Sequence, residues 1–154
     1  MAPNKAENMA RFIGIDVGTR KIGLAVADED SSFAVPSDVI DALGAPTAIS
    51  KRILEEDFSV VVIGLPVDQK GKEGPAAKRS RTFALLLERA MLKDECTAAI
   101  EFVDERLTTI IAHHLLSETG MKGKKQKDQV DAIAAQQILQ AYLDSLRNGA
   151  PHGG

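Results

Sequence analysis

Apolar and polar residues alternate over positions 11–28 in a pattern that predicts two strands joined by a tight turn. Every second residue is apolar and mostly branched over 13–17 and again over 22–26, and the turn falls at 18–21. One acid, Asp16, stands among the apolar residues near the end of the first strand. A carboxylate in such surroundings is costly unless it is paired or bound to a cation. Asp16 therefore indicates that another part of the chain, or a cation, meets its carboxylate.

The remaining pattern predicts a mixed α/β chain. A third strand is expected over 33–40, at a sheet edge because Pro36 interrupts it. The uninterrupted β-branched run at 60–66 is typical of a strand covered on both faces, and a last strand is expected over 98–105. The helical pattern predicts helices at 45–57, 75–93, 108–119 and 128–147, with loops at 67–74 and 121–127. Side chains expected to face inward from the second of these helices are Phe83, Leu86, Leu87 and Ala90.

This order of elements predicts a mixed five-stranded sheet flanked by helices. The first three strands are expected to be antiparallel, and the strands at 60–66 and 98–105 to be parallel. The chain of 154 residues suits one domain over 11–147, with flexible tails at 1–10 and 148–154.

Composition narrows the function classes. The chain is 44% hydrophobic and 27% charged, with one cysteine and so no intramolecular disulfide. No apolar run approaches the length of a membrane span and no targeting peptide is evident, so we expect a cytoplasmic protein with no membrane partner. The formal net charge of −3 does not favour nucleic-acid binding in general, so any such binding must depend on local basic patches. Both a monomer and a homodimer fit this composition.

Further acids stand near the ends of other elements. Asp104 and Glu105 end the strand at 98–105, and Asp131 lies in the last helix with Asp128 three residues before it. Active sites in open sheets gather at the carboxyl ends of strands. Because adjacent strand residues face opposite sides, only one of Asp104 and Glu105 can point at Asp16.

Two interpretations of these acids remain open at this point. Asp131 would complement the helix dipole if it lay in the first turn, and Glu105 beside Arg106 would be an ordinary solvated strand end. Alternatively, the acids would together suit a hard divalent cation, since Mg²⁺ takes oxygen ligands. Such ions promote displacement at phosphodiesters.

Basic residues cluster in the segments that would flank this edge of the sheet. They occupy the hairpin turn, the loop after Pro66, the start of the next helix, the position after Glu105 and the segment before the last helix. Positive charge there would attract phosphates, and the scarcity of aromatic residues argues against base stacking as the main binding mode. The candidate nucleic-acid contacts are Arg20, Lys21, Lys70, Lys72, Arg79, Arg106, Lys122, Lys124, Lys125 and Lys127.

Five short segments occur in one order along the chain and together carry a resemblance. They are IDVGTRKIGLAV at 15–26, VIGLP at 62–66, GKEG at 71–74, VDERLTT at 103–109 and VDAIAA at 130–135. The set resembles the YqgF/RuvX family of ribonuclease H-like proteins, described as Holliday junction resolvases and as pre-16S rRNA nucleases. The resemblance spans about residues 11–144.

The resemblance implies a ribonuclease H-like fold with three acids that match Asp16, Glu105 and Asp131. In the family these acids would hold Mg²⁺ or Mn²⁺ and activate water for phosphodiester hydrolysis. By analogy with related resolvases we favour Glu105 over Asp104, and Asp128 is a candidate for a fourth acid.

The function that the resemblance implies is a metal-dependent nuclease acting on structured nucleic acid. The preferred substrate is the 5′ end of precursor 16S rRNA in ribosome biogenesis. The alternatives are a Holliday junction resolvase in DNA recombination or repair, and a non-catalytic factor that binds rRNA or the ribosome. An ATP-binding protein of the actin or sugar-kinase type shares the Asp-x-Gly-Thr hairpin but needs two domains around a cleft, and this chain has the length of one.

Overall fold

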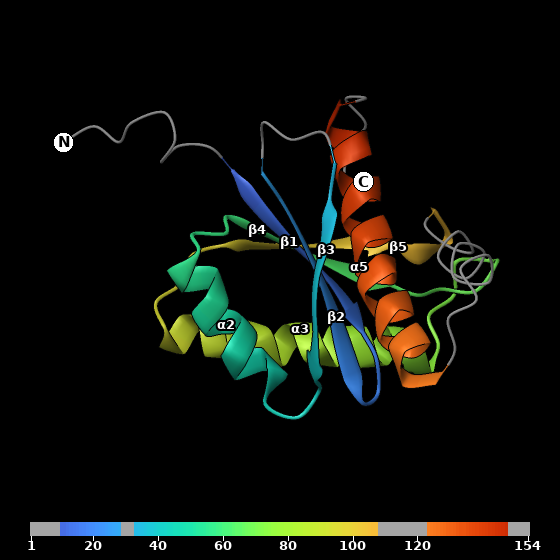
Figure 1. The fold of residues 1–154 in the computed structure, drawn as a ribbon, viewed down its shortest axis with the longest axis horizontal. Helices are drawn as coiled ribbons and strands as arrows, with labels where there is room; N and C mark the ends of the chain where they lie inside the picture. The colour runs from blue at the N-terminus through green and yellow to red at the C-terminus, as the bar shows by residue number, and fades with distance from the viewer. Residues whose placement is uncertain (1–9, 29–32, 108–122, 148–154) are drawn as a thin grey trace.

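The computed structural model describes residues 10–28, 33–107 and 123–147 (Figure 1). In chain order the elements are β1 (Arg11–Val17), β2 (Lys21–Asp28), β3 (Val35–Asp41), α2 (Ala45–Glu55), β4 (Val60–Leu65), α3 (Pro75–Lys93), β5 (Ala99–Asp104), a single 3-10 turn (Glu105–Leu107) and α5 (Gly123–Arg147). Both α2 and α3 carry a proline in their first turn, where its missing N–H costs nothing.

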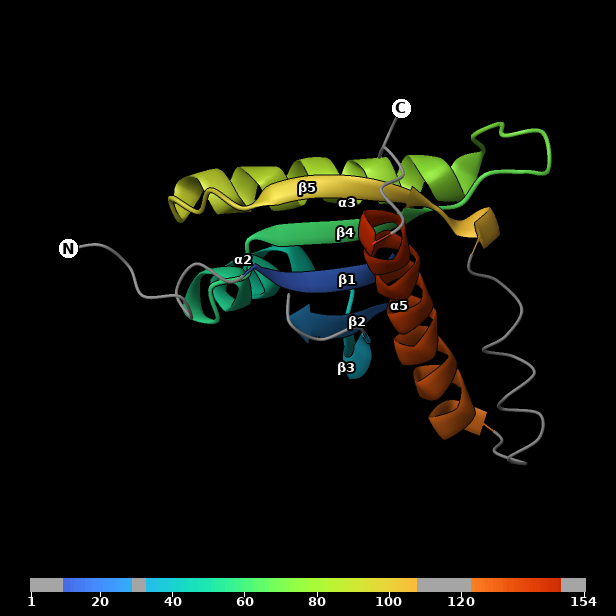
Figure 2. The same cartoon turned by 90° about the horizontal axis from the view of Figure 1, so that it is seen from above.

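The strands form one sheet in the order β3-β2-β1-β4-β5 (Figure 2). β1 pairs with β2 and β2 with β3 in antiparallel fashion, whereas β4 runs parallel to β1 and β5 parallel to β4. The predicted mixed sheet is therefore confirmed. The strand that contains Pro36 lies at an edge as expected, because proline cannot donate to a central ladder.

The two faces of the sheet bury different side chains. Under α2 and α3 the sheet presents branched aliphatic residues such as Ile13, Ile15 and Ile63, which are fully buried. Under α5 it presents smaller residues such as Ala25 and Ala27, packed with Ile138 and Leu139 of the helix. β4 contributes Val61 and Ile63 to the first face and Val62 to the second, which fits the expectation that it is covered on both sides.

The last helix begins earlier than its sequence pattern predicts. α5 starts at Gly123 rather than at 128, so most of the expected basic loop at 121–127 is helical. The lysines and the glutamine of this segment are good helix formers, and their polar character hides the helix from a search for apolar periodicity. The helix expected at 108–119 and the tails at 1–9 and 148–154 lie outside the described residues.

Two smaller predictions also differ from the structure. Leu86 is 47% exposed, and Ala84 is buried in its place, since the inward stripe of α3 runs through Ala77, Ser80, Ala84, Leu87 and Met91. Glu105 lies just beyond β5, in the 3-10 turn. Across the described ranges, no helix is long and apolar enough to cross a membrane.

Candidate active site

Asp16 lies on the α5 face of the sheet, at the end of its most central strand. It is the sixth residue of β1 and pairs across the ladder with Gly23 of β2. Phe12, two pleats earlier on the same side, packs against α5. Residues of even number in β1 therefore face α5, and Asp16 is among them.

Glu105 reaches the same face from the other side of β4. Val103 packs against the α5 cluster, whereas Phe102 packs against the opposite cluster. Asp104, the last residue of β5, therefore faces away from α5, and Glu105, in the turn that follows, lies on the α5 side. The Glu105 carboxylate lies over Gly64 of β4, where an added methyl group would come within 2.8 Å of Oε2.

Gly64 makes this approach possible. The parallel register pairs Ile15 with Ile63, so Gly64 lies beside Asp16. With no side chain at Gly64, the carboxylate of Glu105 can lie across β4 in the direction of β1.

Asp131 completes the group from α5. A methyl group added to Gly23 would lie 2.1 Å from the backbone oxygen of Asp131, so the helix backbone rests directly on the residue opposite Asp16. Asp131 is the ninth residue of α5, which starts at Gly123. The interpretation of Asp131 as a first-turn acid that complements the helix dipole is therefore wrong.

The electrostatics of Asp16 reflect these neighbours. Burial, followed by the negative charges of Glu105 and Asp131, raises the pKa of Asp16 from 3.8 to about 7. Burial, and then the charge of Asp104, raises the pKa of Glu105. The negative charges of Glu105 in the turn after β5 and of Asp131 in α5 thus disfavour the charged form of Asp16.

The chemistry of these side chains fits a hard divalent cation, which takes carboxylate oxygens and would offset their repulsion. Among the side chains that the structure describes, however, no group of three Asp, Glu, His or Cys residues is arranged to hold a metal ion.

Asp104 has a different partner. Its carboxylate accepts hydrogen bonds from Nε and Nη2 of Arg106 at 2.9 and 2.5 Å, and from the Arg106 backbone N–H at 2.9 Å. These bonds lower the pKa of Asp104. The Asp104 carboxylate is therefore hydrogen-bonded to Arg106, and this contact helps to fix the turn that contains Glu105.

The predicted basic contacts are distributed unevenly. Arg20, Lys70 and Lys72 are exposed near the carboxyl ends of the strands, and Arg79 is partly buried. Lys21 forms an ion pair with Asp41 at 2.8 Å. Arg106 is exposed and bonded to Asp104. The other predicted contacts and Asp128 have side chains outside the described residues: Lys122, Lys124, Lys125, Lys127 and Asp128.

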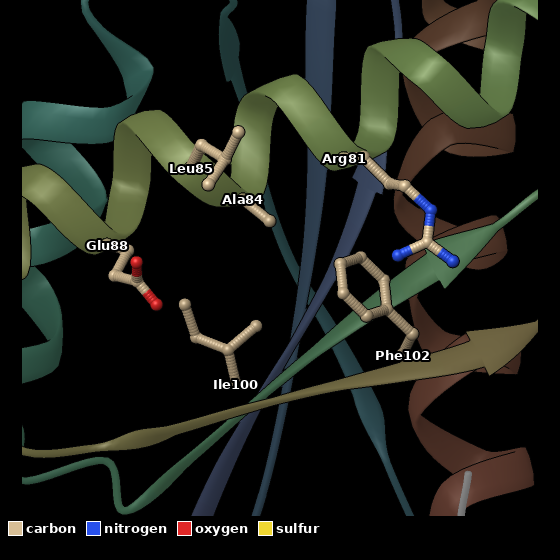
Figure 3. Close-up of a pocket in the computed structure, with 6 residues that line it drawn as sticks. All are labelled: Arg81, Ala84, Leu85, Glu88, Ile100 and Phe102. Carbon is tan, nitrogen blue, oxygen red and sulfur yellow. The ribbon is translucent and has the colours of Figure 1, made fainter.

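A groove between α3 and β5 lies on the other face of the sheet (Figure 3). Phe102 forms part of its lining, and the Arg81 guanidinium lies 5.1 Å from the centre of that ring. Its single acid is Glu88, and Phe102 packs against the α2–α3 side of the core. The groove is therefore separate from the acids around Asp16.

Sequence reasoning missed the residues that allow the acids to approach. The glycines beside Asp16 were expected to leave room for close approach of another group, but Gly23 and Gly64 were not singled out for this role. The pairing of Arg106 with Asp104 was also missed, and its signal is local, an acid two residues before an arginine at a strand end.

Solved structures with a similar fold include Thermus thermophilus RuvC bound to a Holliday junction substrate. That match has a TM-score of 0.57 at 13% identity and covers 93% of this chain and 99% of that one. A second Thermus thermophilus RuvC structure matches with a TM-score of 0.52 at 15% identity, over 92% of this chain and 98% of that one. At these identities the likeness concerns the fold, which is of the ribonuclease H type.

Relatives at higher identity carry the name "Putative pre-16S rRNA nuclease". The protein from Chloroflexus aurantiacus is 38% identical over 140 residues, which cover 89% of this chain and 88% of the relative. The protein from Bifidobacterium adolescentis is 38% identical over 148 residues, covering 88% and 98%.

The fold and the relatives together place this chain among the nucleases, which are hydrolases that act on ester bonds of nucleic acid. Its fold is ribonuclease H-like. A family model described as RuvX, Holliday junction resolvase, matches residues 10–145. The chain belongs to this RuvX (YqgF) family.

Proposed function

We propose that this chain is a divalent-metal-dependent endonuclease that cleaves structured nucleic acid, with the 5′ end of precursor 16S rRNA as its substrate. The observation that carries the proposal is the meeting of negative charges at Asp16, whose pKa is raised to about 7 by burial and by Glu105 and Asp131. A concentration of negative charge at the carboxyl end of a central strand is suited to binding a cation. The names of the relatives support rRNA as the substrate.

In this proposal Asp16, Glu105 and Asp131 hold Mg²⁺ or Mn²⁺, with Asp128 as a further candidate ligand. When bound, such an ion stabilises the developing charge on the phosphate and activates the attacking water. The chain itself supplies the placement of the three carboxylates, through Gly64 beneath Glu105 and Gly23 beneath α5.

Basic side chains would hold the nucleic-acid backbone around these acids. Arg20 in the hairpin turn and Lys70 and Lys72 in the segment after β4 are exposed, so they can neutralise phosphates without disturbing the core. We extend the proposal to Arg79, Lys21 and the lysines before α5, Lys122, Lys124, Lys125 and Lys127. Residues 11–147 would form one nuclease domain that works in the cytoplasm as a monomer or homodimer.

The test is cleavage of a labelled rRNA precursor in Mg²⁺ or Mn²⁺, with the new 5′ end mapped. We expect cleavage by the wild-type chain, and none above background for Asp16→Asn or Glu105→Gln. Asp57→Asn is a matched control, because Asp57 is exposed just before β4 and has a positive φ of 57° that asparagine tolerates. Cleavage that survives Asp16→Asn, or that is absent from the wild type, would contradict the proposal.

A branched DNA substrate is the second candidate, favoured by the family description. A synthetic four-way junction in the same assay distinguishes the two, since a junction resolvase would cut it symmetrically and leave the rRNA precursor intact. Binding of rRNA without cleavage of either substrate, unchanged in Asp16→Asn, would instead indicate a non-catalytic ribosome-binding factor.

A further inference from the structure

Arg106 joins two segments that are far apart in the sequence. Its guanidinium donates to the Asp104 carboxylate through Nε and Nη2 at 2.9 and 2.5 Å, and through Nη1 to the backbone oxygen of Gln69 at 3.2 Å. The first contact is at the end of β5 and the second is in the segment between β4 and α3. The two views of the fold place these segments side by side beyond the carboxyl ends of the strands (Figures 1 and 2).

The segment after β4 is a small ordered hairpin, residues 67–73. Its ends meet in an antiparallel bridge between Val67 and Glu73. Inside it, the Asp68 carboxylate accepts hydrogen bonds from the backbone N–H groups of Lys70 and Lys72, each at 2.8 Å. The Asp68 backbone N–H donates a hydrogen bond to the Lys72 carbonyl at 2.9 Å. The hairpin therefore presents Lys70 and Lys72 from a backbone that is already fixed.

The hairpin is tied to its surroundings on two sides. Glu73 accepts two hydrogen bonds from Arg81 of α3, at 2.6 and 2.7 Å. On the other side Arg106 approaches Gly71, where an added methyl group would lie 3.7 Å from the guanidinium nitrogens. Gly71 has a positive φ of 83°, a conformation that suits glycine.

The same arginine determines the turn that carries Glu105. The Asp104 carboxylate accepts the Arg106 backbone N–H at 2.9 Å, and the Arg106 side chain folds back onto that carboxylate. Glu105 stands between these two residues, with its carboxylate over Gly64. Loss of the bonds on either side of Glu105 would leave its backbone less constrained.

We infer that Arg106 is a positioning residue that couples the lysine-bearing hairpin at 67–73 to the placement of Glu105. Its catalytic consequence rests on the proposed nuclease function. The sequence suggested instead that Arg106 contacts nucleic acid directly. Lysine cannot replace it, because a single ammonium group cannot bond a carboxylate in two places and reach Gln69 at the same time.

The kinetic test compares Arg106→Lys with two other variants. We expect Arg106→Lys to lower kcat about tenfold or more and to raise KM, because a small displacement of a catalytic group is costly. The double variant Lys70→Ala, Lys72→Ala should raise KM and leave kcat close to that of the wild type. Arg89→Lys, at an exposed position of α3, is the matched control and should change neither. If Arg106→Lys behaves as the wild type, or changes KM alone, the inference is wrong.

A second test does not depend on activity. Amide exchange followed by NMR reports on the backbone N–H groups of Lys70, Lys72 and Arg106. These groups donate hydrogen bonds to the carboxylates of Asp68 and Asp104. In Arg106→Lys we expect all three to exchange several-fold faster at an unchanged melting temperature, with wild-type rates in Arg89→Lys. Unchanged exchange at Lys70 and Lys72 would overturn the coupling even if the chain proved to have no nuclease activity, and faster exchange would support it in that case.

Discussion

Strand β1 begins at Arg11 and approaches its end at Asp16, and these two charged side chains have opposite surroundings. Arg11 pairs with Asp28 at 2.8 Å, donates to the backbone oxygen of Glu56 and lies 4.7 Å from the centre of the Phe58 ring. Asp16 has the charges of Glu105 and Asp131 as its neighbours, and its pKa rises to about 7.

The difference separates the part of the sheet that maintains the fold from the part that can do chemistry. At the Arg11 end each contact lowers the energy of the charged group. At the Asp16 end burial and the neighbouring negative charges disfavour the charged carboxylate. Functional sites commonly retain such unfavourable interactions, which the rest of the fold must compensate.

The largest expected effect comes from removing the charge at Asp16. Asp16→Asn should lower the cleavage rate by at least about 10²-fold, the loss typical of a single group that stabilises a transition state.

Without divalent ions at pH 8 the same change should raise the free energy of unfolding by roughly 2–4 kcal/mol, at about 1.4 kcal/mol per unit of pKa shift. Urea unfolding in EDTA measures the second effect, and lower stability of Asp16→Asn would contradict it.

The wild-type chain should also lose stability as the pH rises. The pKa of Asp16 is higher in the folded chain (about 7) than its ordinary value of 3.8, so between these values the folded state binds more protons. The stability that protonated Asp16 contributes is therefore fully present below pH 3.8, falls as the pH rises toward 7, and is lost above that value. Glu105, whose pKa is also raised, adds a change of the same sign. Unfolding in EDTA across this range should show a steeper fall for the wild type than for Asp16→Asn, and parallel curves would argue against the assignment.

A smaller effect is expected from the glycine that lies beneath α5. Gly23→Ala would place a methyl group 2.1 Å from the backbone oxygen of Asp131, and a backbone atom cannot rotate away. We expect a loss of about 1–3 kcal/mol, as for overpacked cores, together with reduced cleavage because Asp131 moves. In Gly74→Ala the methyl group would meet nothing within 4 Å, so this control should be nearly neutral. Equal stability of the two variants would show that α5 adjusts without difficulty.

The smallest effect is expected at the other end of β1. Arg11→Met removes a partly exposed ion pair and a ring contact, which together should contribute about 1 kcal/mol. Cleavage should not change, since Arg11 is at the far end of the strand from Asp16. A loss of activity larger than the loss of stability explains would show that the two ends are coupled.

Much of the sheet could be predicted from the sequence, because strand patterns are local. The hairpin at 11–28, the doubly covered run in β4 and the edge position of the strand with Pro36 follow from alternation, β-branching and the missing proline N–H. Asp16 was found because a carboxylate among apolar residues is unusual, and Asp104, Glu105 and Asp131 because they stand near the ends of elements. The preference for Glu105 over Asp104 came from the family resemblance.

What could not be predicted depends on packing between distant segments. The start of α5 was misplaced because its first turns are polar and lack an inward stripe. The roles of Gly23 and Gly64 appear only when α5 and Glu105 lie on them. Likewise, the bond from Arg106 to the distant Gln69 has no signal in the local sequence.

The most direct test of the acidic site is Mn²⁺ binding followed by electron paramagnetic resonance in wild type, Glu105→Gln and Asp104→Asn. If Asp16, Glu105 and Asp131 hold the ion, the wild type binds Mn²⁺ and Glu105→Gln loses at least about tenfold in affinity. Asp104→Asn should weaken binding much less, because that carboxylate is bonded to Arg106. Equal affinity in Glu105→Gln and wild type, or a larger loss in Asp104→Asn, would contradict the assignment of Glu105 to the site.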